Sequence, residues 1–168
     1  MIIRPAVKED AAAIVAIYNY YIENSHATFE IEAIDADELA QRMADVRLQG
    51  FPYLVAVVDR QIVGYAYATA WRKRPAYRHS AEVSVYVEPS AITKGIGGAL
   101  YTQLIDEMRK LDIHTLIGGI SLPNDASVRL HERFGFEKVA HFRETGRKFD
   151  GWIDVGYWQL MLSDDRSN

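Results

Sequence analysis

The sequence contains no cysteine among its 168 residues, which excludes disulfide bonds, thiolate metal sites and a cysteine nucleophile. No stretch approaches the roughly 18 consecutive apolar residues that a membrane-spanning helix requires. A basic excess is also missing, because the net charge is −4 and offers no general attraction for nucleic acid or an anionic membrane. The first ten residues, MIIRPAVKED, lack an apolar signal region. We therefore expect a cytoplasmic protein without nucleic-acid or membrane partners.

Repeats, low-complexity tracts and linker-like stretches are absent as well, so the length favours one domain over residues 1–168. Apolar periodicity and turn residues predict the elements of this domain. Strands are expected at 2–6, 53–58, 62–69, 81–87, 115–120, 137–149 and 152–162, the last two joined by a turn at Asp150-Gly151. Helices are expected from Lys8, from Asp35, at 96–111 and at 124–134. This order predicts an α+β, or mixed α/β, fold in which helices cover both faces of the sheet.

The most informative motif is a glycine-dense turn, KGIGG at residues 94–98, between a β-branched strand and an amphipathic helix. Glycines allow an anion to approach the backbone, and the helix start directs unpaired N–H groups toward it. The spacing does not match a Walker A loop. A dinucleotide fingerprint is excluded too, because Leu100 stands where its third glycine is needed. The turn is either a phosphate site or an ordinary strand-to-helix connection.

A second notable feature is Glu82, a carboxylate within the β-branched run of residues 81–87. Strand alternation places Glu82, Ser84 and Tyr86 on one face of the sheet and the valines on the other. Taken alone, this position fits an exposed strand face, a salt bridge or a general base.

The glycine turn resembles the Gln/Arg-x-x-Gly-x-Gly/Ala loop of the GNAT superfamily of N-acetyltransferases, with Ile92 where the family usually has Arg or Gln. The order of seven strands and four helices is similar to the GNAT fold along nearly the whole chain. Other segments look like the phosphinothricin and methionine sulfone acetyltransferase group. They are IYN (17–19), ATFE (27–30), GYA (64–66), WR (71–72), AEVSVYV (81–87), NDAS (124–127), LHERFGF (130–136) and GRKFDGWIDV (146–155).

The resemblance implies transfer of acetyl from acetyl-CoA to an amine, without a metal. An α-amine has a pKa of about 8, so only roughly a tenth is neutral at pH 7 and a general base is useful. The resemblance assigns that role to Glu82. It makes His131 the candidate proton donor for the thiolate, with a structural histidine as the alternative. None of the other histidines has metal-ligand spacing.

The resemblance also implies how acetyl-CoA is held. The pantetheine arm would enter beside the backbone of Val85, Tyr86 and Val87, where one N–H polarises the thioester carbonyl. The alternative is ordinary core pairing of that strand. Contact with the cofactor is further implied for Asn124 and Ser127, for which N-capping of a helix is the other possible role. The pyrophosphate would lie on the amides of Thr93, Lys94, Gly95, Ile96, Gly97 and Gly98.

The acceptor is expected to be the α-amine of a small amino acid with a compact polar head. Residues 71–79 form a concentrated basic stretch, and Arg72 in it lies just before the strand that carries Glu82. Arg72, together with Arg74, would anchor an anionic group, because arginine binds carboxylates in a bidentate manner. The alternative is a solvated loop. The resemblance implies that Phe29 and Glu30 form one wall of the acceptor site, and Trp71 would border the acceptor with Phe29. The alternatives are an enzyme acting on a protein amino terminus, a lysine or a polyamine, and a non-catalytic acyl-CoA sensor.

We also expect a homodimer, because four aromatic residues lie in the last two strands and relatives in this group pair through their C-terminal regions. These residues are Phe149, Trp152, Tyr157 and Trp158. Packing against the core of the same chain is the alternative.

Overall fold

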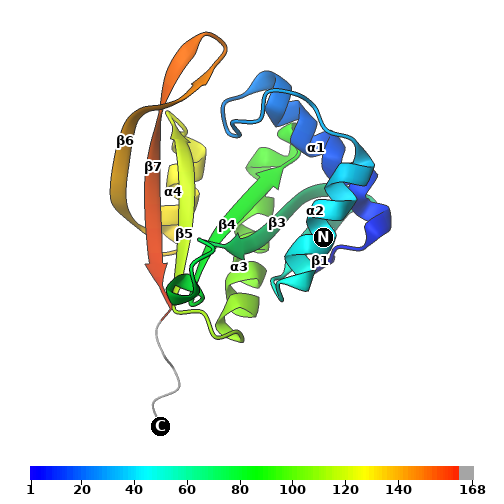
Figure 1. Ribbon diagram of the computed structural model, residues 1–168. Helices are drawn as coiled ribbons and strands as arrows, with labels where there is room; N and C mark the ends of the chain where they lie inside the picture. The colour runs from blue at the N-terminus through cyan, green and yellow to red at the C-terminus, as the bar shows by residue number, and fades with distance from the viewer. Residues whose placement is uncertain (163–168) are drawn as a thin grey trace.

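A computed structural model describes residues 1–162, except for the side chains of Thr93 and Lys94. In this part of the chain one seven-stranded sheet has the order β1-β2-β3-β4-β5-β7-β6, with four α-helices around it (Figure 1). The strands are β1 (Ile2–Pro5), β2 (Tyr53–Val58), β3 (Gln61–Ala70), β4 (Ser80–Val87), β5 (Thr115–Leu122), β6 (Glu137–Lys148) and β7 (Gly151–Met161). The helices are α1 (Ala11–Asn24), α2 (Ala36–Leu48), α3 (Ile96–Arg109) and α4 (Asp125–Arg133). The predicted element order and fold class are confirmed.

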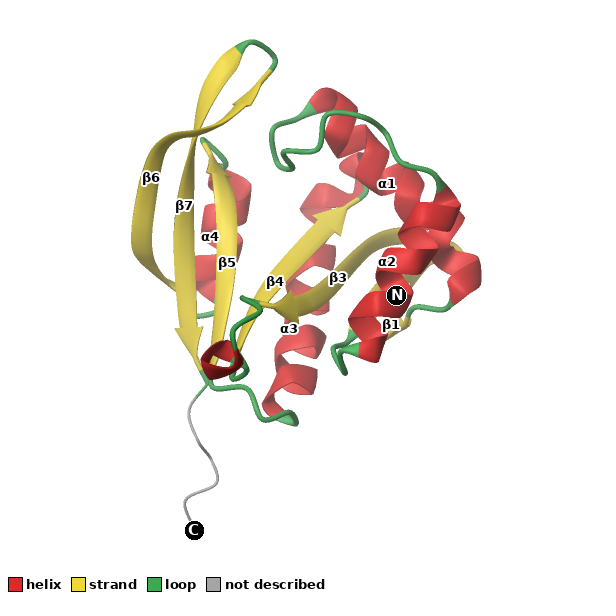
Figure 2. Ribbon diagram, in the orientation of Figure 1, coloured by secondary structure: helices red, strands yellow, loops and turns green. Residues whose placement is uncertain are grey.

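The helices cover both faces of the sheet, each over its own apolar core (Figure 2). On one face α3 buries Leu100, Leu104 and Met108 against β2, β3 and β4. On the other face α1 and α2 cover a cluster that contains several tyrosines from β2 and β3. Within the described residues, no helix has both the length and the apolar character needed to cross a membrane.

Helix α2 shows how directly a local signal fixes an element. The side chain of Asp35 accepts a hydrogen bond from the backbone N–H of Glu38 at 2.8 Å, which satisfies a donor that the first helical turn leaves open. Leu39, Met43 and Val46 are buried on one stripe, as the helical spacing predicts.

Two predicted boundaries differ in an informative way. The first helix was expected from Lys8, but residues Lys8–Asp10 form a 3-10 turn and α1 begins at Ala11. The Asp10 carboxylate there binds Arg4 through two hydrogen bonds, of 2.6 and 2.8 Å, and the Val7 N–H at 2.8 Å. The Asp10 side chain thus binds both this turn and β1, and the regular helix begins only after it, at Ala11.

The second difference is the tip of the β6–β7 hairpin. The turn residues are Phe149 and Asp150, both with a left-handed φ of 49° and 58°, and Gly151 already belongs to β7. Two-residue hairpin turns of this kind need positive φ at both central positions. The predicted turn at Asp150-Gly151 was one residue late, because glycine and aspartate tolerate such angles better than phenylalanine does.

The four aromatic residues expected on a dimer surface do not share one environment. Trp158 is 2% exposed and donates its indole N–H to the Glu132 carboxylate on α4 at 3.2 Å. By contrast, Phe149 and Trp152 at the hairpin tip are 61% and 63% exposed. The prediction is corrected for Trp158, which belongs to the core because α4 covers that end of β7.

The sheet changes character between β4 and β5, its one parallel pair among the described strands. These strands pair only at Ser80 with Thr115, Ala81 with Leu116 and Glu82 with Ile117. Beyond Glu82 they diverge, which Figure 1 shows as a widening gap between the labelled arrows. The rest of β4 consequently has a strand neighbour on its β3 side alone.

Candidate active site

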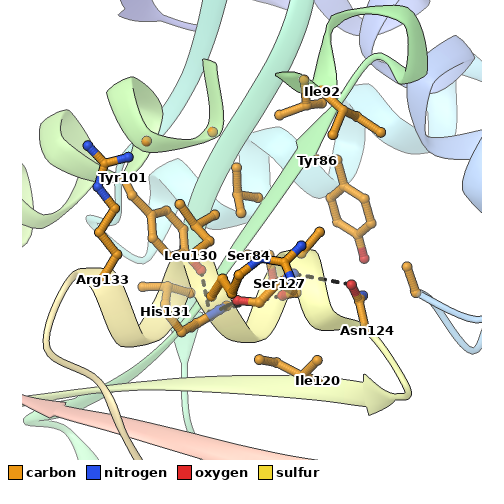
Figure 3. A pocket seen from close by; sticks show the side chains of 18 of the residues that line it. Ser84, Tyr86, Ile92, Tyr101, Ile120, Asn124, Ser127, Leu130, His131 and Arg133 are labelled. Carbon is orange, nitrogen blue, oxygen red and sulfur yellow. Dashed lines mark hydrogen bonds between the residues drawn. The ribbon is translucent and has the colours of Figure 1, made fainter. Parts of the chain in front are cut away.

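The gap between β4 and β5 holds a cavity of ≈ 470 Å³ (Figure 3). Its walls come from β4, β5, the glycine turn and α4. The side chain of Ile96, another predicted cofactor residue, is buried in the core, so Ile96 can offer a ligand only its backbone. The predicted cofactor residues that line the cavity are Val85, Tyr86, Val87, Gly95, Gly97, Gly98, Asn124 and Ser127.

The backbone of β4 presents polar groups to this cavity. The N–H of Glu88 donates to the Val63 carbonyl on β3 at 2.8 Å. Because the backbone groups of successive strand residues point to alternate sides, the N–H and C=O groups of Val85 and Val87 point away from β3. The carbonyl of Val87 accepts a hydrogen bond from the Tyr21 hydroxyl at 2.6 Å. In the described part of the chain, the N–H groups of Val85 and Val87 have no strand partner on that side. Such groups need a partner from a ligand or from water.

The glycine turn leaves the start of α3 open. Gly95 has a left-handed φ of 74°, which favours glycine, and it precedes the first residue of the helix. Among the residues that the structure describes, the first bond within the helix runs from the Ala99 N–H to the Gly95 carbonyl, so the N–H groups before Ala99 have no partner within α3. A Cβ added at Gly95 or Gly98 would meet nothing within 4 Å.

Other predicted residues of this turn are less informative. Thr93 and Lys94 end a 3-10 helix, Pro89–Lys94, and their side chains lie outside the described part of the structure. Ile92 is 49% exposed at the cavity wall. An apolar surface therefore stands where the resemblance would lead one to expect the polar side chain of Arg or Gln.

Glu82 lies where β4 and β5 separate, on the face opposite the α3 core. It is half-buried, and a Cβ added at Gly119 of β5 would lie 3.3 Å from its Oε1. Burial raises the pKa of Glu82 above its usual value. Among the described residues no cation forms a salt bridge with it. The salt-bridge and exposed-face alternatives thus do not describe this side chain.

A cluster of aromatic and basic side chains lies near Glu82 through Tyr157, because Tyr157 and Glu82 both lie close to Gly119. The ring of Trp71 meets Tyr157 edge-on at 5.5 Å, and the guanidinium carbon of Arg72 lies 5.1 Å from the Trp71 ring. Burial raises the pKa of Tyr157, and the charge of Glu82 adds to this effect. Arg72 is exposed, and the described residues offer it no carboxylate partner. Its guanidinium is available to an anion.

The remaining predicted substrate residues, Arg74, Phe29 and Glu30, have different surroundings. Arg74 is exposed at the start of a short 3-10 helix, Pro75–Tyr77. Phe29 is 40% exposed and its ring lies against Gly146 on β6. The Glu30 carboxylate turns to α2, where Arg42 binds it at 2.5 Å. Phe29 and Glu30 therefore face different neighbours although they are adjacent in sequence.

His131 is 3% exposed and both of its ring nitrogens have partners, as the dashed lines in Figure 3 show. Nδ1 lies 2.8 Å from the Ser127 carbonyl, which can only accept, so Nδ1 carries the proton. Nε2 then accepts from the Tyr101 hydroxyl at 2.9 Å. Burial lowers the pKa of His131, which favours the neutral ring in this arrangement of hydrogen bonds.

Asn124 caps α4, because its Oδ1 accepts from the Ser127 N–H at 3.2 Å. Both residues also line the cavity, so capping does not remove them from it. Within the described residues, no group of three or more histidine, aspartate and glutamate side chains could hold a metal ion.

Sequence reasoning missed Tyr101, Tyr157 and the Gly118-Gly119 pair. A Cβ at Gly118 would lie 2.3 Å from His131 Nε2, so this glycine makes room for the imidazole ring. Two adjacent glycines inside a β-rich run were the available signal, since such residues mark a close approach. The sequence did not indicate Tyr101, because it lies on the apolar face of α3 and the apolar pattern does not show which of its residues reach a functional site.

Comparison with known proteins agrees with this geometry. Residues 3–156 match a family model described as an acetyltransferase (GNAT) domain. A phosphinothricin N-acetyltransferase of Streptomyces coelicolor is 38% identical over 95% of this chain and 95% of its own length. An L-methionine sulfoximine/L-methionine sulfone acetyltransferase of Salmonella typhimurium is 37% identical over 98% of this chain and 96% of its own length.

Solved structures give the same result. A ribosomal-protein-alanine N-acetyltransferase from Brucella melitensis superimposes with a TM-score of 0.94 and 39% identity, over 96% of this chain and 100% of the other. A phosphinothricin acetyltransferase from Sinorhizobium meliloti in complex with acetyl-CoA also has a TM-score of 0.94, with 35% identity over 99% and 91% of the two chains. The chain belongs to the GNAT acetyltransferase family. It is an N-acetyltransferase enzyme, similar in sequence to the phosphinothricin and methionine sulfoximine acetyltransferases.

Proposed function

We propose that this enzyme transfers acetyl from acetyl-CoA to the α-amine of a small amino acid or analogue, of the phosphinothricin, methionine sulfone or methionine sulfoximine type. Glu82 is the proposed general base. The observation that carries the proposal is the separation of β4 from β5, which opens a cavity beside a half-buried carboxylate that no cation in the described residues neutralises.

The residues of the cavity fit acetyl-CoA, the ligand of the similar S. meliloti structure. The unpartnered N–H groups of Val85 and Val87, with Tyr86 between them, suit the amide-rich pantetheine arm and the thioester carbonyl. The open N–H groups at the start of α3 suit a pyrophosphate. When bound, acetyl-CoA supplies the activated acetyl thioester. The other proposed contacts are Thr93, Lys94, Gly95, Ile96, Gly97, Gly98, Asn124 and Ser127.

Glu82 would take a proton from the incoming ammonium, because only a neutral amine has a lone pair for attack. A pKa raised by burial brings this carboxylate closer to the pKa of the proton that it removes. Arg72, beside Trp71, would bind the carboxylate or the anionic head of the acceptor. Phe29, Glu30 and Arg74 complete the proposed acceptor site.

His131 is the proposed source of the proton for the departing thiolate. In the structure its ring has one proton, at Nδ1 on the Ser127 carbonyl, and Nε2 accepts from the Tyr101 hydroxyl. Donation therefore requires Nε2 to take up a proton from solvent first, in place of the bond from Tyr101, and transfer of that proton to the thiolate returns the ring to its neutral form. His131→Phe tests this role. A fall in kcat of less than about threefold would show that water or the acceptor protonates the thiolate instead.

Thiol release from acetyl-CoA, measured across a panel of amines, tests the proposal as a whole. We expect methionine sulfone, methionine sulfoximine and phosphinothricin to be acetylated with higher kcat/KM than simple alkylamines. Equal rates for an alkylamine and the amino-acid analogues would refute the anchoring role of Arg72.

Acetylation of a protein amino terminus is the second candidate, favoured by the 39% identity to the B. melitensis ribosomal-protein-alanine enzyme. A peptide that begins with alanine has no free carboxylate next to its α-amine, whereas a free amino acid has one. Arg72→Ala should therefore raise KM for methionine sulfone at least about tenfold and leave the KM of the peptide unchanged. Higher kcat/KM for the peptide in the parent enzyme would favour this second candidate.

We also propose a homodimer. Val139, Phe142, Phe149 and Trp152 are exposed apolar side chains on β6 and at the hairpin tip, and β6 is an edge strand of the sheet. Sedimentation that shows only a 19.1 kDa species at micromolar concentration would exclude a stable dimer.

A further inference from the structure

Lys148, the last residue of β6, is a buried cation that the proposed chemistry does not use. Its residue surface is 6% exposed. The ammonium Nζ donates to the Ser25 carbonyl at 2.7 Å and to the Thr28 carbonyl at 2.9 Å. Burial lowers the pKa of Lys148, and the charge of Glu30 opposes this effect. Burying a cation is costly, so a position that keeps one has a structural or functional use for these two bonds.

The two carbonyls belong to residues 25–30, the first part of the connection between α1 and α2, which we call the 25–30 loop. This loop touches both sides of the site, because Ala27 lines the cavity and Phe29 is the proposed wall of the acceptor pocket. The Ser121 hydroxyl on β5 also donates to it, reaching the His26 carbonyl at 2.5 Å. The loop is thus held to the C-terminal half of the sheet by side chains from β5 and β6.

Phe29 has a defined seat on β6. A Cβ added at Gly146 would lie 2.4 Å from Phe29 Cζ and 2.5 Å from Cε2, so the aromatic ring occupies the space that this glycine leaves. Gly146 and Lys148 are two residues apart in a regular stretch of β6 and share one face of the strand. Lys148 binds the backbone of the loop, and Gly146 leaves space for the Phe29 ring.

We propose that Lys148 is a positioning residue for the acceptor amine. By binding the 25–30 loop to β6 it fixes Phe29 on Gly146, and this contact sets the width of the acceptor pocket and hence KM for the amino acid. The inference rests on the proposed function, because Phe29 bounds an acceptor only if the amine binds beside Glu82. Lys148 acts through the loop and does not itself touch the acceptor, since its ammonium is directed at two carbonyls.

Lys148→Met is the direct test, because methionine has a similar length and removes both donors. The two loop carbonyls are then left without these partners, and the loop moves away from β6. We expect KM for methionine sulfone to rise at least about tenfold, while kcat and the acetyl-CoA Kd change by less than about threefold. This separation of KM from Kd is a result that a general loss of stability does not produce.

Gly146→Ala is a second variant that leaves the Lys148 bonds in place and displaces Phe29 from its seat. It should raise the same KM. Because both changes act through Phe29, the double variant should raise KM by less than the product of the single effects. If Lys148→Met does not fold, Gly146→Ala decides the question, and an unchanged KM then overturns the inference.

Asp10→Asn is the matched control. Asp10 is also buried and also holds charge-assisted hydrogen bonds, but it lies at the start of α1, at the end of that helix away from the 25–30 loop. It should lower Tm and leave KM unchanged. If Lys148→Met behaves like this control, with a lower Tm and KM within about twofold, the inference is wrong. If the parent enzyme acetylates no amino-acid analogue, the proposed function fails instead, which is a distinct result.

Discussion

Replacing Glu82 with glutamine changes one property of the site and little else. Glutamine has nearly the same size and shape as glutamate, so it fits beside Gly119, where Oε1 lies 3.3 Å from the position of a built Cβ. It cannot accept a proton from an ammonium. The variant therefore isolates the proposed base from any packing role of the side chain.

The expected loss follows from the chemistry of the step. General-base catalysis contributes about 10²–10⁴-fold, which corresponds to roughly 3–5 kcal/mol of transition-state stabilisation. The acetyl-CoA Kd should stay within about threefold of the parent value, because Glu82 is not among the residues that line the cavity. We therefore expect kcat/KM for methionine sulfone to fall at least about a hundredfold.

The loss should depend on pH in a defined way. Above about pH 8 the α-amine is mostly neutral and needs no base, so parent and variant converge. Below the pKa of Glu82, which burial raises above 4.5, the parent loses its base as well. The ratio of parent to variant kcat/KM should thus be largest between these two pKa values.

Stability gives an independent check on the same variant. A carboxyl group with a raised folded pKa binds its proton more tightly in the native state. Stability therefore falls as the pH rises from the unfolded pKa through the folded pKa, and the whole cost is present above the folded pKa. Glu82→Gln should therefore have a Tm at pH 7 equal to or above that of the parent. Glu107→Gln, a carboxylate-to-amide change on the outer side of α3, is the control and should leave activity unchanged. A Glu82→Gln enzyme with the parent kcat/KM at every pH from about 6 to 9 would refute the assignment.

Two further predictions concern the glycine turn and the amino terminus. A Cβ at Gly97 would make only ordinary contacts of 3.5 and 3.6 Å, so Gly97→Ala should keep the acetyl-CoA Kd within about threefold, whereas the bulkier Gly97→Val should raise it more than about tenfold in calorimetry. A hydrogen bond from Arg4 lowers the pKa of Asp10 below 3.8, so the stability from this pair is present above that value and is lost as the pH falls below it. Asp10→Asn should remove that acid-sensitive component, and thermal melts of both proteins between about pH 2 and 5 that keep a constant Tm difference would contradict this prediction.

The parts of the fold that sequence predicted well are those fixed by neighbours in the chain. The cap at Asp35 and the buried stripe of α2 need only residues three and four positions apart. The environment of Trp158 could not be predicted in this way. It has the same strand parity as the exposed Trp152, and only the position of α4 along β7 makes one a core residue and the other a surface residue.

The same distinction holds for the site. The glycine turn and Glu82 were visible because each breaks the local pattern, one with glycines and the other with a charge inside a β-branched run. Their meeting place was not visible, because it depends on how far β4 pairs with β5 before the strands diverge. Lys148 gave no signal of its own, since a lysine near a hairpin tip is usually solvated and only the tertiary fold brings it to the 25–30 loop.

The bond between Lys148 and the Ser25 carbonyl joins positions 123 residues apart in the chain, which bears on the order in which the enzyme becomes complete. During synthesis, the proposed cofactor side of the site, from β4 to the start of α3, emerges before β6 exists. The 25–30 loop is made earlier still. It cannot pack against β6 until Gly146 and Lys148 have left the ribosome and the β6–β7 hairpin has formed. Contacts of such long sequence separation form late, because the intervening chain must be ordered first. We therefore expect the wall of the proposed acceptor pocket to be among the last parts of this enzyme to assemble, after the surfaces proposed to hold the acetyl donor.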